Sequence, residues 1–198
     1  MKNLFSIKSN SFTKVRYAFL GFSLILLVYM IWPIPGKISD FKALPDSEKS
    51  ALAGDNISQV PNVAAYFSNN YRDFSVKFYQ QNFKELTKLP IPPYRLNYPP
   101  EYSFVAIKKH TDTTYIEELV YPLKGSIFVN GYEPFNPDKT PKFWGASKFD
   151  VNGLSWDTKT TIRLYPSSVF IRLIVWLGIT LSILLLYRLS RKVFSKGI

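Results

Sequence analysis

The sequence predicts a membrane protein in which two transmembrane α-helices flank one extracytoplasmic α+β domain. Three observations lead to this prediction. Two long apolar runs stand in the first and last parts of the 198-residue chain, basic residues without acidic ones adjoin them, and helix, strand and turn patterns fill the middle. Aromatic residues make up 17% of the chain and charged residues only 20%, which is too apolar for a disordered chain.

The first apolar run, residues 17–35, is predicted to be a transmembrane helix. Its uncharged part from Tyr17 to Trp32 covers about 24 Å as a helix, and the prolines that follow stop the helix. Tyr29 and Trp32 lie at its far end, where aromatic side chains favour the membrane interface. The alternative is a cleaved signal peptide, but the run is long for one and no small-residue cleavage motif follows it.

The second apolar run, residues 167–187, is predicted to be the other transmembrane helix. Ser167 and Ser168 follow a proline and are suited to cap its N-terminus. Its single charged residue, Arg172, lies one turn from the start, from where a long side chain reaches the lipid headgroups. Arg188 marks the opposite membrane interface.

Small residues within the two runs predict where these helices contact other helices. Gly178 and Ser182 are four residues apart in the second run, a spacing that lets two helix backbones approach closely. Ala18 and Gly21 form a weaker patch of the same kind in the first run.

The net charge of +11 is concentrated in two segments. Residues 1–16 and 188–198 each hold four basic residues and no acidic one. The positive-inside rule therefore predicts that both are cytoplasmic tails and that the segment between the spans is translocated. Because the charge is not a stripe on a folded domain, nucleic-acid binding is not expected. The expected partners are the lipid bilayer and either other membrane protein subunits or further copies of the chain.

The translocated segment divides into a linker with one short helix, residues 36–60, and an α+β domain, residues 61–166. Residues 62–88 are predicted to form one long amphipathic helix. Its apolar residues recur every three or four positions, so they share a face that packs on the core or on a partner; they are Val63, Phe67, Tyr71, Phe74 and Phe78. Residues 89–100 contain five prolines and predict an extended connector that is neither a helix nor a central strand.

The rest of the domain has the pattern of an antiparallel sheet. Strands are predicted at residues 102–107 and 160–165. Residues 114–123 could form a short helix capped by Asp112, but their β-branched and aromatic residues favour a strand. The dipeptides Asn130-Gly131 and Asn152-Gly153 predict two hairpins, because Asn-Gly supplies the positive φ angles of a type I′ turn.

The composition excludes several kinds of chemistry. The chain has no cysteine and one histidine, which excludes disulfides, cysteine nucleophiles and metal centres built from several cysteines or histidines. No cofactor and no metal site are expected. The weak candidates are a general base made of His110 and Asp112, a serine–lysine dyad of Ser126 and Lys124, and a hard-cation site at Glu133 and Asp138. None of them belongs to a specific catalytic motif, so the sequence favours a protein that is not an enzyme.

The leading hypothesis is a non-catalytic two-pass membrane subunit whose extracytoplasmic domain scaffolds or regulates a cell-envelope complex. The order of tail, span, outer domain, span and tail resembles that of bacterial polysaccharide chain-length determinants, which implies a homo-oligomeric regulator of surface-polysaccharide assembly. The resemblance covers topology alone, because that family's long helical outer region and proline-rich second span are not matched. A third hypothesis is a membrane-anchored hydrolase or transferase acting at the headgroup layer. The excess of lysine over arginine is typical of an AT-rich bacterial genome.

Overall fold

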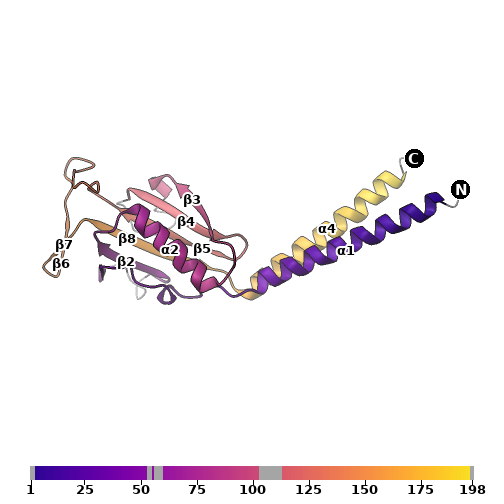
Figure 1. Ribbon diagram of the computed structural model, residues 1–198, viewed down its shortest axis with the longest axis horizontal. Coiled ribbons are helices and arrows are strands. Elements are labelled where there is room, and N and C mark those ends of the chain that lie inside the picture. The colour runs from indigo at the N-terminus through magenta and orange to yellow at the C-terminus, as the bar shows by residue number, and fades with distance from the viewer. Residues whose placement is uncertain (1–2, 53–54, 56–59, 103–112, 197–198) are drawn as a thin grey trace. The chain divides into compact units, whose positions relative to one another are not determined.

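The computed structural model describes residues 3–52, 55, 60–102 and 113–196, and its contacts divide the chain into two units (Figure 1). The helical unit consists of Met1–Trp32 and Ser167–Ile198. The sheet unit consists of Pro33–Pro166. This division places both predicted spans in one unit and the predicted α+β domain in the other.

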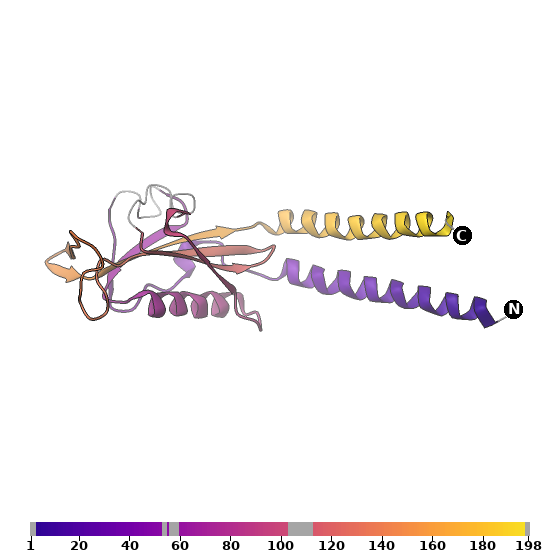
Figure 2. The same cartoon turned by 90° about the horizontal axis from the view of Figure 1, so that it is seen from above.

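The helical unit consists of α1 (Asn3–Ile31) and α4 (Val169–Lys196), which run antiparallel (Figures 1 and 2). Their apolar windows, Lys14–Ile31 and Val169–Phe194, are long and apolar enough to cross a membrane, by length and composition alone. Only 11% and 6% of these windows is buried, which is unlike the core helix of a soluble protein. Both helices extend into the segments predicted to be tails.

The expected helix ends are found in this unit. Helix α1 stops at Ile31, before the Pro33-Ile34-Pro35 segment, as predicted. At the start of α4, Ser168 accepts a hydrogen bond from the backbone N–H of Ile171 at 3.3 Å, which confirms Ser168 as a capping residue.

The sheet unit is built on a six-stranded antiparallel sheet with the strand order β1-β2-β8-β5-β4-β3. Helix α2 (Arg72–Thr87) covers one face of this sheet (Figures 1 and 2). Short 3-10 helices lie at Ile38–Asp40 and Pro100–Tyr102. The strands of the large sheet are β1 (Ser47–Lys49), β2 (Val63–Ser68), β3 (Tyr94–Tyr98), β4 (Tyr115–Tyr121), β5 (Gly125–Tyr132) and β8 (Thr158–Pro166). The hairpin of β6 (Phe149–Val151) and β7 (Leu154–Trp156) stands apart from it.

The core of the sheet unit lies between α2 and the central strands. Val76, Tyr79 and Phe83 of α2 are fully buried. The ring of Phe83 packs edge-on against Tyr121 of β4, with ring centroids 5.0 Å apart. Helix α2 is therefore held to the sheet by apolar contacts, whose burial is the main favourable term in folding.

The prediction of one helix over residues 62–88 is wrong in its first part. Residues 63–68 form β2, between β1 and β8, and α2 begins only at Arg72. All six residues of β2 are buried, so the strand lacks the alternation of apolar and polar residues that marks a half-exposed strand. Its apolar residues then continue into those of α2 at spacings that imitate one helix. The short helix predicted within residues 36–60 is also wrong at Ser47–Lys49, which form β1 and pair with β2.

The hairpin predicted at Asn130-Gly131 is wrong as well. Strand β5 runs straight through both residues and pairs with β4 and β8. A Cβ on Gly131 would stand 2.0 Å from Cε1 of Tyr115, so the glycine makes room for the buried tyrosine ring and does not make a turn.

The other predicted hairpin is confirmed. Asn152 and Gly153 connect β6 and β7 with φ angles of 51° and 80°, as a type I′ turn requires. The predicted strands at 114–123 and 160–165 are also confirmed, as β4 and β8. The proline-rich segment contains β3, which is an edge strand and not a central one. Of the strand predicted at 102–107, Tyr102 belongs to a 3-10 helix and the other residues lie outside those described.

We predict that Gly131→Ala lowers the free energy of unfolding by about 1–3 kcal/mol, because the added methyl group overpacks the Tyr115 ring. The control is Gly36→Ala, since a Cβ on Gly36 meets no atom within 4 Å. Denaturant unfolding of the full chain in detergent measures both variants. Equal stability of the two would contradict the packing role of Gly131.

Candidate functional site

A loop fixed by ion pairs joins β5 to β6; we call residues 133–148 the aromatic loop. At its start, Glu133 accepts hydrogen bonds from the Lys142 ammonium at 2.7 Å and from the backbone N–H of Arg72. Within the loop, the backbone N–H of Asn136 donates to the Thr140 carbonyl at 2.8 Å. The buried carboxylate of Asp157, beyond β7, pairs with Lys139 and also with Lys148, at 3.0 Å. The loop is thus tied to α2 and to the start of β8.

This fixed loop exposes two large aromatic side chains. Trp144 is 100% exposed and Phe143 is 40% exposed, although Phe143 also packs on Tyr132 with ring centroids 6.0 Å apart. Burying an aromatic side chain contributes more to stability than burying most others, so a folded domain rarely leaves a tryptophan in water. An aromatic anchor held on a pre-organised loop is typical of a protein-binding surface.

Asp157 provides the main electrostatic support of the aromatic loop. Burial of this carboxyl opposes its ionisation, but hydrogen bonds from Lys139 and Lys148 outweigh the burial and lower the pKa of Asp157. The backbone N–H of Asp157 also donates to the Asn69 side chain at 3.0 Å. The carboxylate therefore stays charged in the folded protein over the neutral range.

A second buried carboxylate joins α2 to the edge of the sheet. Glu117 of β4 is fully buried and accepts hydrogen bonds from Arg72 of α2, at 2.7 Å, and from both Nε and Nη2 of Arg95 of β3. Arg72 also donates to Asn97 at 3.0 Å. Both oxygens of Glu117 thus have arginine donors, which fits a structural role that fixes the first turn of α2.

The neighbouring carboxylate faces the other side of the sheet, as adjacent residues in a strand do. Glu118 accepts a hydrogen bond from the Tyr98 hydroxyl at 2.7 Å. This hydrogen bond, with some burial, raises the pKa of Tyr98 to about 12. Glu117 and Glu118 therefore do not form a catalytic pair.

In the helical unit, hydrogen bonds from side chains of α4 reach backbone carbonyls of the N-terminal segment. Arg172 of α4, only 3% exposed, donates to the Trp32 carbonyl at 2.8 Å. One turn later the Trp176 indole N–H donates to the Ser23 carbonyl at 3.0 Å. The guanidinium thus provides a donor and a positive charge at the C-terminal end of α1, where the helix dipole favours a cation.

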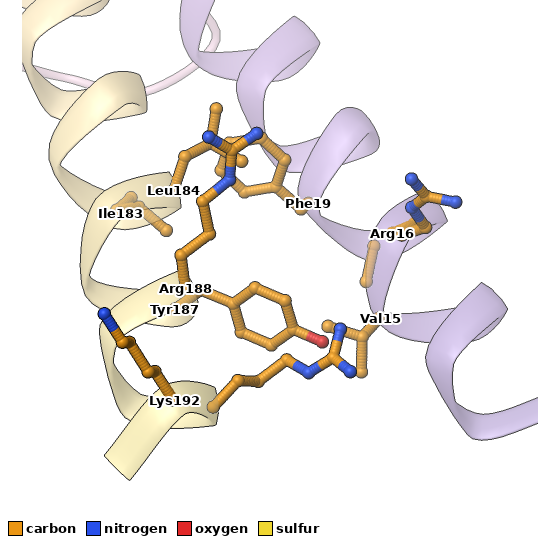
Figure 3. A pocket seen from close by; sticks show the side chains of 10 residues that line it. Val15, Arg16, Phe19, Ile183, Leu184, Tyr187, Arg188 and Lys192 are labelled. Atoms are coloured by element: carbon orange, nitrogen blue, oxygen red, sulfur yellow. The ribbon is translucent and has the colours of Figure 1, made fainter. Parts of the chain in front are cut away.

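Towards their other ends, α1 and α4 diverge and leave a groove with a volume of about 840 Å³ (Figures 2 and 3). Apolar side chains and four cationic ones line it. Figure 3 shows Tyr187 and Arg188 pointing from α4 into the space between the helices, whereas Lys192 points away from it. We call this space the basic groove; its lining residues are Val15, Arg16, Ala18, Phe19, Ile183, Leu184, Tyr187, Arg188, Arg191 and Lys192.

The small residues predicted as a helix interface lie outside the contact between α1 and α4. A Cβ on Gly178 or on Gly21 would meet no atom within 4 Å, and Ser182 is exposed. Ala18 lines the basic groove. These positions therefore stay a prediction for contact with another helix. Arg172 and Trp176 join the two helices, a contact that was not predicted from the sequence. The signal that could have identified them is that each carries a polar group within an apolar run.

The predicted membrane-interface residues take different positions. Tyr29 is half-buried, and Trp32 provides the carbonyl that Arg172 binds. Arg172 was expected to extend to the lipid headgroups, but it is buried against this carbonyl. Arg188 lines the basic groove.

The four aromatic residues predicted to share one helix face do not do so. Phe67 is buried in β2, and Tyr71 precedes α2 and donates its hydroxyl hydrogen to the Asn136 carbonyl at 3.0 Å. Phe74 is 47% exposed and stacks on Phe78, with ring centroids 6.2 Å apart. Because the helix begins at Arg72, its buried face is formed by other residues, among them Val76 and Phe83. Phe74 and Phe78 instead border a shallow groove of about 350 Å³ with Lys42 and Lys77.

The structure describes only some of the weak catalytic and metal candidates, and these have other contacts. His110 and Asp112 lie outside the described residues. Ser126 is paired within β5, and Lys124 is buried in the preceding turn. Glu133 binds Lys142, whereas Asp138 accepts hydrogen bonds from Thr140. Among the residues that the structure describes, no group of three or more His, Cys, Asp or Glu side chains is placed to hold a metal ion.

Comparison of the chain with protein-family models, with curated proteins and with solved structures finds no match. Two features of this chain therefore bear on its function. One is the aromatic loop on the sheet unit, and the other is the pair of apolar helices with its basic groove.

We predict that Asp157→Asn lowers the free energy of unfolding at pH 7 by about 1–3 kcal/mol, because two lysines lose their carboxylate. The pKa of Asp157 is lower in the folded than in the unfolded chain, so its contribution is present above pH about 4 and disappears as the pH falls through the folded pKa. Denaturant unfolding of both proteins across pH 2–7 tests this; a difference that persists at the lowest pH would contradict it.

Proposed function

We propose that the chain is a non-catalytic two-pass membrane subunit whose sheet unit lies outside the cytoplasm and binds another protein of the cell envelope. The observation that carries the proposal is the pair of exposed apolar helices that precede and follow a folded sheet unit in the sequence. The apolar windows of α1 and α4 cover about 27 Å and 39 Å, against a hydrocarbon core of about 30 Å.

The contact between the helices supports two retained spans over a cleaved signal peptide. Trp176 of α4 donates to a carbonyl of α1, and Arg172 of α4 donates to the carbonyl of Trp32, which directly follows α1. Loss of α1 would leave the arginine of an apolar helix without its acceptor, at a cost that membrane helices avoid. Helix α1 therefore has a structural role that a removable segment lacks.

The charges support the orientation. Residues 3–16 of α1 and 188–196 of α4, which belong to the two basic segments, lie at the same end of the helix pair, because the two helices run in opposite directions. The positive-inside rule assigns such a pair of segments to the cytoplasm. The segment between the helices is then extracytoplasmic.

The aromatic loop supports a binding function for the sheet unit. Ion pairs to Glu133 and Asp157 fix its backbone while Trp144 stays fully exposed. Such an arrangement reduces the entropy that is lost on binding, because the loop is already ordered. A protein partner with an apolar pocket would cover Trp144.

Single-cysteine labelling tests the topology, because the chain has no native cysteine. We expect a membrane-impermeant maleimide to label Trp144→Cys in intact spheroplasts and to label Lys196→Cys only after permeabilisation. The unaltered chain is the control for background labelling. Labelling of Lys196→Cys in intact spheroplasts would contradict the proposed orientation, and loss of the chain from the membrane fraction would contradict the spans.

Photo-crosslinking tests the aromatic loop. We expect a photoreactive phenylalanine at Trp144 to crosslink to another membrane or envelope protein in living cells. The control is the same replacement at Leu123, which is 51% exposed but lies at the opposite end of β5. A product made of two copies of the 22.9 kDa chain would favour the homo-oligomeric regulator of polysaccharide assembly. Equal products from both positions, or none from Trp144, would contradict a partner site at the loop.

A further inference from the structure

The basic groove combines two chemical surfaces in one cavity. Phe19, Ile183 and Leu184 give it an apolar wall, and cationic side chains from both helices stand at its edge. None of the ten lining residues is acidic. The groove therefore suits an amphipathic anion and offers no favourable contact to a cation. The four cationic residues are Arg16, Arg188, Arg191 and Lys192.

The contact between α1 and α4 places the cations of both helices at one level. Arg172 is level with Trp32, because its guanidinium binds the Trp32 carbonyl. Arg16 lies 16 residues before Trp32, and Arg188 lies 16 residues after Arg172, which is about 24 Å along each helix axis. In an antiparallel pair these equal distances bring Arg16 and Arg188 to the same depth.

This depth is the boundary between apolar and basic residues in both helices. On α1 the uncharged run begins directly after Arg16, and on α4 it ends directly before Arg188. If the helices span the bilayer as proposed above, the groove crosses the cytoplasmic interface. Its apolar wall then faces acyl chains and its cations face the headgroups.

We propose that the basic groove binds one anionic phospholipid molecule. The phosphate lies against Arg188 and its neighbouring cations, and one acyl chain lies along Phe19 and Leu184. The Tyr187 ring, which points into the groove with its hydroxyl towards α1, adds an apolar surface and a polar group at the same interface (Figure 3). Arginine is suited to this contact because its planar guanidinium donates two parallel hydrogen bonds to a phosphate.

The charge distribution favours a lipid over a second helix as the occupant. A helix from another copy of this chain would bring its own basic segment to the same depth and would repel these four cations. An anionic lipid neutralises them instead. The inference rests on the proposed membrane topology.

Native mass spectrometry of the purified full chain tests the proposal. The chain is released from nanodiscs that contain equal amounts of phosphatidylglycerol and phosphatidylcholine. Two variants alter the groove: Arg188→Gln removes one cation, and Ala18→Phe narrows the groove without a change of charge. The matched control is Lys14→Gln, which removes one positive charge from α1 near the same depth but outside the lining of the groove.

We expect one phosphatidylglycerol per chain to be retained in preference to phosphatidylcholine. Arg188→Gln should weaken this retention about fivefold, the effect of one basic residue at an anionic surface. Ala18→Phe should also weaken it, whereas Lys14→Gln should not. Equal retention of both lipids, or equal losses in Arg188→Gln and Lys14→Gln, would overturn the proposal in favour of diffuse surface attraction. If cysteine labelling still gives the expected topology, the lipid site alone has failed.

Discussion

The exposed apolar surface of α1 and α4 is the constraint on which the rest of this structure depends. Side chains such as Leu24, Ile25, Leu185 and Leu186 project away from the helix pair. Leaving them in water costs about 25 cal/mol for each Å² of apolar area, and a bilayer removes that cost for the whole length of both helices. Because the helices are antiparallel, the segment between them is then held at one side of the membrane.

Within the helix pair, polar contacts provide what apolar packing does not. Helices in lipid gain little from burying leucine against leucine, so hydrogen bonds and close packing determine how they associate. Arg172 and Trp176 donate to carbonyls of Trp32 and α1 near one end of the pair, and the basic groove opens towards the other. One end is thus joined by these hydrogen bonds, and the other opens into the groove for which we propose a lipid ligand.

The sheet unit follows the same principle with buried carboxylates. Glu117 joins α2 to β3 and β4 through two arginines, and Asp157 joins the aromatic loop to the start of β8 through two lysines. A buried carboxylate is costly unless its oxygens are satisfied, so each of these groups defines the arrangement of the segments that satisfy it. The result is a loop joined to the rest of the sheet unit by ion pairs, from which Trp144 projects.

The sequence was sufficient for features that depend on local chemistry. Apolar length identified both long helices, and the positive φ angles of Asn152 and Gly153 determined the β6–β7 hairpin. The same reasoning failed at Gly131, because its partner is the ring of Tyr115 on the next strand, which local sequence does not specify. It also failed for Val63–Ser68, since a strand buried on both faces has no period of two.

The candidate sites were harder to predict than the fold. The sequence does not identify Trp144 as a binding residue. Nothing in the neighbouring residues shows that Glu133 and Asp157 hold the loop around it through ion pairs. The basic residues of the groove were recognised as tail charges. Their common depth follows from contacts between the helices, such as that of Arg172 with Trp32, which join residues far apart in the chain.

Protease protection in sealed membrane vesicles tests the central claim most directly. We predict that inverted vesicles protect one fragment that contains the whole segment between α1 and α4, and that right-side-out vesicles leave this segment open to digestion. Protection in the right-side-out vesicles, or release of the chain into the soluble fraction, would contradict a two-pass protein with an extracytoplasmic sheet unit.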